Sequence, residues 1–486
     1  MVIERELFID GKDVPAWERR TTEDLNPYTG GVYATVAAGG PADVVRAVDA
    51  AQRAFEPWAD TAPSVRRGIF LRAADILEAR AAEVVELMAH EVGGVSSWAR
   101  FNTALAANML REAAAVVTQP LGEVLATEPA DRLSMAVREP LGVIAAFSPW
   151  NAPVILGTRS IAVPLAVGNT AVLKPSEDAP IASGLLIADV LREAGLPPGV
   201  LNVVTNARTD AAEVAKTLIA DPQVRMVNFT GSTRVGRVIG TTAAENIKPA
   251  VLELGGKNAV LVLDDADLDH AVDAVTFGAF HNAGQICMSA DRVLVHRSVA
   301  EEFTVRLAAK VAGLPHGDPA DQSTVVGPLI TESAARRVSE LVAEAVADGA
   351  RVRAGGGERE GTRYPATVLD GVTPRMRIFR EEIFGPAVTV ITVEDDDEAV
   401  SIANDTEYGL TAGVLTSDTR RGLALAKRLR TGIVHVGDQT VDDEPQAPFG
   451  GVKSTGYGRF GGRWGVDAFT ATRWVTVAGH HGRYPF

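Results

Sequence analysis

The sequence contains very little cysteine: Cys287 is the single one among 486 residues. One cysteine cannot form a disulfide within the chain, which excludes a disulfide-built secreted scaffold and zinc sites made of several cysteines. Long apolar runs are also missing, because the stretches 141–147 and 161–167 are far shorter than the ~18–20 residues of a membrane helix. The N-terminal residues carry charge where a signal peptide has an apolar core. We therefore expect a cytoplasmic protein that does not contact a membrane.

Positive charge is scarce as well. The chain has 47 Lys and Arg against 62 Asp and Glu, which gives a formal net charge of −15. Nucleic acids and anionic membranes bind through clustered Lys and Arg, so this balance disfavours both as partners. The hydrophobic share of 46% and the charged share of 22% are typical of a globular protein and argue against disorder.

Short apolar runs alternate with helix-length stretches in two successive series. The first series has runs at 142–147, 170–173, 200–204 and 226–229, with helices expected at 182–194 and 210–219. The second has runs at 258–263, 292–295, 387–392 and 432–436, with a helix expected at 300–312. Strand, crossover and strand at this spacing are typical of a parallel sheet. The sequence therefore predicts an α/β protein with two doubly wound domains.

Other segments fall outside these series. Helices are expected from Pro41 to a stop at Pro57, and from about residue 64 to 90. The segments 132–139 and 472–478 look like strands, and because unpaired strands leave backbone groups unsatisfied, we expect them to pair within or between subunits. The acidic stretches 264–269 and 394–398 are expected to be solvated loops.

Candidate chemistry begins with Cys287. A lone cysteine is commonly a small buried hydrophobe. This one, however, lies in Phe-His-Asn-Ala-Gly-Gln-Ile-Cys-Met-Ser (280–289), among small and polar residues instead of in an apolar strand. Glu253 lies upstream in Leu-Glu-Leu-Gly-Gly-Lys (252–257), and Asn151 in Phe-Ser-Pro-Trp-Asn-Ala-Pro (147–153) follows a predicted strand. Open α/β sheets present their ligand-binding loops at such strand ends.

Three further segments could bind a ligand. Val-Leu-Lys-Pro-Ser-Glu (172–177) ends a predicted strand, and Glu-Glu-Ile-Phe-Gly-Pro (381–386) precedes the run 387–392. Asn-Phe-Thr-Gly-Ser-Thr-Arg-Val-Gly (228–236) runs from a strand into a helix, where free N–H groups and the helix dipole suit a phosphate. Alone, each of these motifs is a weak indication.

In combination and in this order, the segments resemble the NAD(P)-dependent aldehyde dehydrogenase family over essentially the whole chain. Phe-Gly-Gly-Val-Lys-Ser-Thr-Gly-Tyr-Gly-Arg (449–459), after Asp-Asp-Glu-Pro-Gln (442–446), is most similar to the branch acting on vanillin, benzaldehyde and salicylaldehyde. The resemblance implies oxidation of an aldehyde, here an aromatic one, to the acid with NAD⁺ through a cysteine thiohemiacetal and a thioester. An aliphatic semialdehyde is the main alternative substrate. A CoA-acylating enzyme, whose relatives lack a glutamate such as Glu253, and a non-catalytic crystallin-like protein are further alternatives.

The resemblance also assigns roles to individual residues. Cys287 would be the nucleophile, Asn151 an oxyanion donor and Glu253 the general base, and no metal is expected. The expected cofactor residues are Lys174 and Glu177 at the adenosine ribose, Gly231 and Ser232 at the pyrophosphate, Glu382 and Phe384 at the nicotinamide ribose and ring, and Pro149, Trp150, Val235 and Leu254 elsewhere in the pocket. NAD is expected over NADP, although NADP is possible, because the charge of Glu177 would repel a 2′-phosphate.

Arg159 is the candidate substrate residue. It lies eight residues after Asn151, close to two helical turns, so both could face one cavity. A guanidinium suits ring oxygens or the ring itself, but a structural pair with a nearby carboxylate is the alternative.

The resemblance further implies an NAD-binding domain (1–120 and 141–252), a catalytic domain (253–450) and oligomerisation strands (121–140 and 465–486). The expected assembly is a homodimer or homotetramer.

Overall fold

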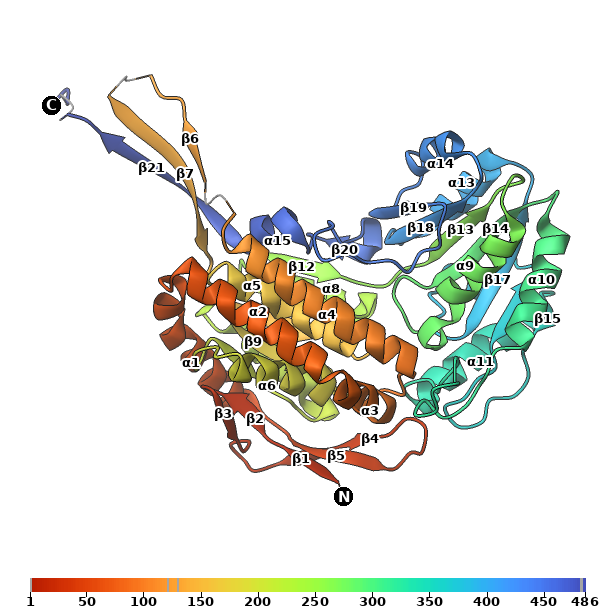
Figure 1. Ribbon diagram of the computed structural model, residues 1–486, viewed down its shortest axis with the longest axis horizontal. Coiled ribbons are helices and arrows are strands. Elements are labelled where there is room, and N and C mark those ends of the chain that lie inside the picture. Colours follow the sequence, from red (N-terminus) through yellow and green to blue (C-terminus); the bar gives the residue numbers. More distant parts are fainter. Residues whose placement is uncertain (1, 120–121, 129–130, 481–483) are drawn as a thin grey trace.

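The computed structural model describes residues 2–119, 122–128, 131–480 and 484–486. The chain forms two large sheets flanked by helices and two three-stranded sheets (Figure 1), which confirms the predicted α/β class. The predicted domain limits stay predictions. Parts of the predicted segments 1–120, 121–140 and 465–486, namely residues 1, 120–121, 129–130 and 481–483, lie outside the described residues.

The first large sheet has eight strands, in the order β20-β12-β11-β8-β9-β10-β2-β3. Its strands are β20 (Gly456–Tyr457), β12 (Ala250–Glu253), β11 (Val224–Thr230), β8 (Val143–Ser148), β9 (Thr170–Pro175), β10 (Leu201–Val203), β2 (Leu7–Ile9) and β3 (Lys12–Val14). The central five, β12 to β10, are parallel. The chain forms β8, β9 and β10 outward and then returns to place β11 on the other side of β8. This reversal creates a crevice at the carboxyl ends of β8 and β11, the usual place for a ligand in such sheets.

Helices cover both faces of this sheet. Val143, Ala145 and Phe147 pack in one hydrophobic cluster with the first group of helices, whereas Ile144 and Ala146 pack in another with the second group. The first group is α1 (Pro41–Ala59), α7 (Ala211–Ala220) and α8 (Thr233–Glu245); the second is α2 (Pro63–Ala79), α3 (Ala81–Glu91), α4 (Ser96–Val116), α5 (Pro153–Ala166) and α6 (Leu186–Glu193). Because side chains alternate along a strand, the two helix groups lie on opposite faces. Burial on both faces explains why β8 is a continuous apolar run.

The second large sheet has seven strands, in the order β15-β16-β17-β14-β13-β18-β19. They are β15 (Arg351–Ala354), β16 (Thr367–Asp370), β17 (Ala387–Val393), β14 (Ala290–His296), β13 (Asn258–Val262), β18 (Thr411–Leu415) and β19 (Ile433–Val436). All neighbouring pairs are parallel except β15 with β16. The helices of this half are α9 (Leu268–Phe280), α10 (Ala300–Ala312), α11 (Glu332–Ala347), α12 (Arg377–Arg380), α13 (Asp396–Asn404) and α14 (Thr419–Ala426). None of the helices in the described ranges is both long and apolar enough to cross a membrane.

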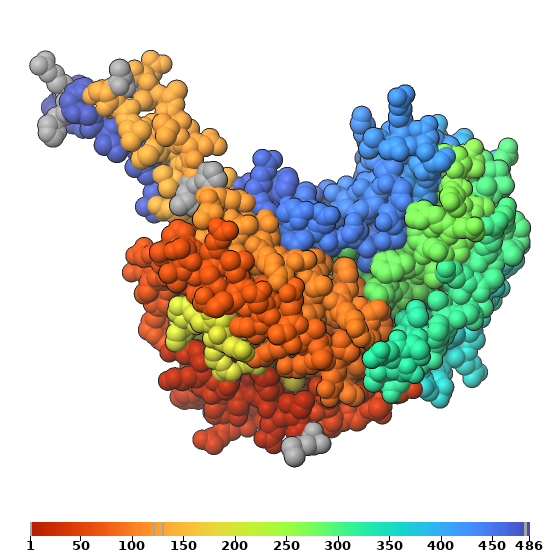
Figure 2. All heavy atoms as spheres, in the orientation of Figure 1, coloured from red at the N-terminus to blue at the C-terminus, as the bar shows by residue number. Residues whose placement is uncertain are grey.

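Two small sheets complete the fold. One joins β1 (Ile3–Arg5), β5 (Val32–Ala37) and β4 (Thr21–Leu25). The other is antiparallel and joins β21 (Thr470–Ala478), β7 (Arg132–Pro140) and β6 (Gly122–Leu125), with α15 (Gly462–Ala468) at its base. The two strands predicted outside the main series therefore pair with each other. This sheet stands clear of the body of the molecule (Figures 1 and 2).

Two expectations about helices were wrong. The helix predicted over 64–90 is broken at Arg80, whose backbone (φ −90°, ψ 13°) separates α2 from α3. Pro57 does not stop α1, which continues to Ala59. Trp58, 1% exposed, anchors this last turn because its indole N–H donates to the Leu165 carbonyl at 2.9 Å.

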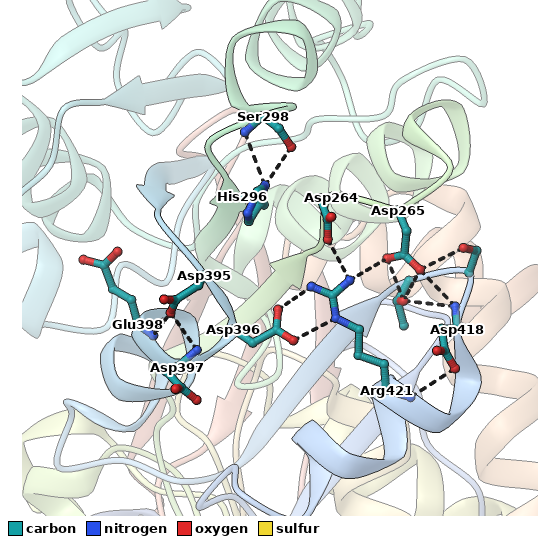
Figure 3. A network of polar contacts seen from close by, with 12 residues as sticks. Asp264, Asp265, His296, Ser298, Asp395, Asp396, Asp397, Glu398, Asp418 and Arg421 are labelled. Atoms are coloured by element: carbon teal, nitrogen blue, oxygen red, sulfur yellow. Dashed lines mark hydrogen bonds and ion pairs between the residues drawn. The ribbon is translucent and has the colours of Figure 1, made fainter.

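The acidic stretches are ordered by specific contacts and are not simply solvated loops (Figure 3). The Arg421 guanidinium donates to both oxygens of Asp396, at 2.7 and 2.6 Å, and to Asp264 at 2.6 Å. Asp395 and Asp418 accept backbone N–H groups at the starts of α13 and α14. The carboxylates thus cap helices and hold three segments of the second domain together.

Candidate active site

A cavity of about 660 Å³ opens where the two large sheets meet. Asn151 follows β8 and Glu253 ends β12, so both lie at the carboxyl edge of the first sheet. Cys287 and Glu382 instead precede β14 and β17, at the amino edge of the second sheet. The predicted site residues that line the cavity are Pro149, Trp150, Asn151, Gly231, Ser232, Glu253, Leu254, Cys287, Glu382 and Phe384.

The Cys287 thiol is free and contacts the cavity. The loop before it is tightly turned, since Asn282 and Ala283 have φ of 49° and 53°. Burial raises the pKa of the thiol to about 12, and the charge of Glu382 adds to this effect. The Cys287 carbonyl accepts a hydrogen bond from the Asn258 amide at 2.8 Å, which fixes the backbone at the nucleophile.

Asn151 is 5% exposed, and hydrogen bonds hold both its side-chain amide and its backbone carbonyl. Its side-chain amide donates to the Gln285 carbonyl at 3.0 Å, two residues before Cys287. Its own carbonyl accepts from the Trp98 indole at 2.8 Å and from Asn282 at 3.1 Å. An amide nitrogen has two hydrogens, so Asn151 retains one for a ligand near Cys287.

Glu253 is 3% exposed, and neither carboxyl oxygen has a hydrogen-bond partner among the residues that the structure describes. Burial raises its pKa well above the usual value, and the charges of Arg159 and Arg459 offset this only in part. A buried carboxylate with a raised pKa is a stronger base than an exposed one. Glu253 lines the cavity that also holds the Cys287 thiol, a combination that suits proton transfer in nucleophilic catalysis.

The N-terminus of α8 also borders the cavity, through Gly231, Ser232 and Thr233. Ser232 caps this helix through its hydroxyl, which accepts the Val235 N–H at 3.4 Å. A Cβ on Gly231 would lie 2.6 Å from the ring of Phe229, so only glycine lets the chain approach so closely here. The remaining free N–H groups and the helix dipole favour a phosphate at this point.

Glu382 and Phe384 also line the cavity. Glu382 accepts the Gly256 N–H at 3.0 Å, and burial raises its pKa to about 7. Phe384, with φ of 49°, stands edge-on to the Trp150 ring at 5.6 Å between centroids. A carboxylate can accept ribose hydroxyls, and the aromatic pair adds apolar surface to the cavity.

These features fit a dinucleotide cofactor. The cavity has the volume of a typical cofactor pocket, with a phosphate-binding helix start, a carboxylate and aromatic rings in one space. By contrast, within the described residues no group of three or more His, Cys, Asp or Glu is arranged to hold a metal ion.

Four predicted residues do not line this cavity: Lys174, Glu177, Val235 and Arg159. Burial alone would raise the pKa of the Glu177 carboxyl, but its ion pair with Lys174 and its hydrogen bonds with the backbone and with Asn206 together lower the pKa. Glu177 lines a neighbouring hollow of about 810 Å³ that shares Trp150 with the cavity. Val235 packs against the hydrophobic cluster on the α1 face.

Arg159 pairs with Asp443, and the side chains are 6% and 5% exposed. Its guanidinium also lies 4.0 Å from the centre of the Phe449 ring. The carboxylate pair that the sequence left as an alternative is therefore present. A substrate contact of Arg159 stays a prediction.

Sequence reasoning did not single out several residues of the site. Arg337 and Tyr408 line the cavity, and Arg337 donates to the Glu382 carbonyl at 3.0 Å. The Gln285 side chain accepts the Ile330 N–H at 3.0 Å and so ties the cysteine loop to a distant segment. Gln285 lay within the quoted motif, but no local signal marked Arg337.

Comparison with known proteins matches residues 14–475 to the model of the aldehyde dehydrogenase family. The chain is 51% identical to a vanillin dehydrogenase of Pseudomonas fluorescens over 479 residues, 99% of each protein. It is 38% identical to a benzaldehyde dehydrogenase [NAD(+)] of Pseudomonas putida, covering 95% of this chain and 94% of the relative. The crystal structure of a salicylaldehyde dehydrogenase from Pseudomonas putida G7, complexed with salicylaldehyde, superposes with a TM-score of 0.97 at 42% identity over 100% of both chains.

Proposed function

The chain belongs to the aldehyde dehydrogenase family, and we propose that it oxidises aromatic aldehydes to carboxylic acids with NAD. As a member of this family it is a nicotinamide-dependent enzyme that acts on aldehydes. The observation that carries the proposal is a single cavity with a free thiol, a carboxamide and a buried carboxylate. The aromatic substrate class rests on the similarity to vanillin, benzaldehyde and salicylaldehyde dehydrogenases.

The first step is addition of the Cys287 thiolate to the aldehyde carbon. The Asn151 amide and the Cys287 backbone N–H donate to the alkoxide that forms, and one such donor typically contributes about 3–4 kcal/mol. The bound nicotinamide supplies the hydride acceptor. Loss of hydride from the thiohemiacetal leaves a thioester on Cys287.

Hydrolysis of this thioester is the task of Glu253. Its carboxylate takes a proton from a water molecule, whose oxygen attacks the thioester carbonyl. Collapse of the resulting alkoxide breaks the carbon–sulfur bond, which releases the acid and returns the Cys287 thiolate. Because Glu253 acts after hydride transfer, it limits the second half of the cycle.

The cofactor is held by this chain's own groups. Ser232 and Gly231 at the start of α8 bind the pyrophosphate, and Glu382 accepts the nicotinamide ribose hydroxyls. Glu177 accepts adenosine ribose hydroxyls, and its negative charge disfavours the 2′-phosphate of NADP. Lys174, paired with Glu177, moderates this repulsion, so NADP is used less well but not excluded.

The assembly is a homodimer or homotetramer formed through the sheet of β21, β7 and β6. Among the described residues β21 and β6 are the edge strands of this sheet, and Val124 and Trp474 on it are 75% and 72% exposed. Such edges and patches pair readily with another copy. Sedimentation equilibrium of the wild type and of Trp474→Lys tests this interface. A cytoplasmic location rests on the sequence and is part of the same proposal.

A panel of aldehydes compared by kcat/KM tests the substrate class. Benzaldehyde, vanillin and salicylaldehyde are expected to exceed propanal and succinic semialdehyde with NAD, and NAD to exceed NADP. Cys287→Ala should abolish NADH formation while cofactor binding, followed by calorimetry, persists. A higher kcat/KM for the aliphatic semialdehyde would overturn the aromatic assignment.

A further inference from the structure

Both charged side chains of the Arg159–Asp443 ion pair are almost fully removed from water, at 6% and 5% exposure. Arg159 comes from α5 and Asp443 from the loop after β19, far along the chain. Burial of two charges carries a large desolvation cost, so such a pair contributes little or nothing to stability compared with apolar residues. The pair therefore calls for a reason other than stability.

The pair lies beside the reaction centre. Leu156, one turn before Arg159 on α5, lines the catalytic cavity. Phe449, which the guanidinium covers at 4.0 Å, precedes Gly450, where a Cβ would lie only 2.5 Å from Glu253 Oε1. The charges of Arg159 and Asp443 also reach both catalytic groups, since each shifts the pKa of Cys287 and of Glu253.

An unpaired guanidinium at this place would attract a carboxylate strongly, because arginine binds carboxylates through charge-assisted, often bidentate hydrogen bonds. An aldehyde that carries a carboxylate would then be held by its wrong end. In this chain the position is already occupied: among the described residues, Asp443 is the hydrogen-bond partner of Arg159. A second carboxylate would meet the negative charge of Asp443.

We propose that Asp443 is a specificity-determining positioning residue, an inference that rests on the proposed function. Because Asp443 occupies the Arg159 guanidinium, it excludes aldehydes that carry a carboxylate and so favours uncharged aromatic aldehydes. Discrimination of this kind uses a repulsive element against the wrong substrate in addition to contacts with the right one. The two charges of the pair are opposite, so the pair adds little net charge beside the cavity.

Charge variants test the role of Asp443. The measured quantity is a selectivity ratio, in which kcat/KM for para-carboxybenzaldehyde is divided by kcat/KM for benzaldehyde. Asp443→Asn frees the guanidinium and is expected to raise this ratio about tenfold or more, mainly by lowering KM for the carboxylated aldehyde. Arg159→Gln leaves Asp443 alone and should lower the ratio while raising kcat/KM for para-(trimethylammonio)benzaldehyde. Asp442→Asn, the same chemical change at a neighbouring side chain that is 56% exposed, is the matched control and should leave the ratio unchanged.

Asp443→Asn leaves a buried cation without its partner and could fail to fold. The double variant Arg159→Gln/Asp443→Asn, which carries neither charge, tests the proposal in that event. Removal of the Asp443 charge from Arg159→Gln should then raise the ratio about tenfold. Equal ratios in these two variants, or an unchanged ratio in folded Asp443→Asn, would overturn the proposal. A residue that only supports the fold would slow all aldehydes alike and lower the melting temperature without changing the ratio. Wild-type protein that oxidises neither aldehyde would instead refute the proposed function.

Discussion

The reactivity of Cys287 in the cofactor-free protein follows from its burial. A thiol whose pKa is raised to about 12 is only ~10⁻⁴ thiolate at pH 8, against about a quarter for an ordinary cysteine of pKa ~8.5. Because iodoacetamide reacts with the thiolate, alkylation at pH 8 should be slower than that of free cysteine by roughly three orders of magnitude. The rate should then rise about tenfold per pH unit from pH 8 to 11.

Glu382 makes this prediction specific. Its charge is the largest electrostatic cause of the raised pKa of Cys287, after burial. The pKa of Glu382 itself is about 7, so the carboxylate is charged at pH 9. Glu382→Gln should therefore lower the pKa of Cys287 and speed alkylation at pH 9. Glu344→Gln is the control, because Glu344 is a half-exposed carboxylate that contacts Arg377 on the surface.

The assay is stopped-flow or mass-spectrometric measurement of alkylation between pH 6 and 11. An inflection near pH 8.5 in the cofactor-free wild type would refute the argument that burial controls the thiol. Equal rates in the Glu382 and Glu344 variants would show that the Glu382 charge does not reach the sulfur.

Three further outcomes follow from the same site. Glu253→Gln should keep a fast burst of NADH while steady turnover falls by two orders of magnitude or more; a burst and a turnover that fall together would give Glu253 another role. Glu177→Gln should narrow the ratio of kcat/KM between NAD and NADP, and a widened ratio would contradict its role at the ribose. Glu91, fully buried with its pKa raised to about 7 by desolvation, favours its protonated form in the folded state. Its contribution to the free energy of unfolding is therefore greatest below about pH 4.5, the unfolded value, and is lost as the pH rises toward 7. Urea unfolding of the wild type and Glu91→Gln between pH 4.5 and 7 should show a steeper fall for the wild type.

Much of the fold could be predicted because its strands are buried on both faces. Continuous apolar runs such as β8 and β13 are recognisable without any partner, and their spacing allows only crossover connections. The break at Arg80 could not be predicted, because apolar residues continue at helical spacing through α2 and α3. The site residues on the first sheet followed from the rule that ligands lie at carboxyl ends of strands. The position of Cys287 did not follow from this rule, since Cys287 lies before the amino end of β14.

The hydrogen-bond partner of Arg159 could not be predicted from the neighbouring sequence. Its spacing from Asn151 suggested that both could face one cavity, and a carboxylate partner was an open alternative. The partner, however, lies 284 residues away, on a loop whose position depends on the whole second domain. Helical spacing has no information about such a contact. Only the packed structure decides which group a buried guanidinium meets.

The connection between the two sheets explains how the nucleophile and the base come to share a cavity. Glu253 ends β12 of the first sheet, and β13 of the second begins at Asn258. Between them, a Cβ on Gly255 would lie 2.6 Å from Glu382 Oε2, and one on Gly256 would lie 2.7 Å from the Cys287 carbonyl. The segments that carry Glu382 and Cys287 lie directly against the backbone at Gly255 and Gly256, where no side chain fits. The two glycines therefore allow these segments to lie directly against the chain that continues from Glu253.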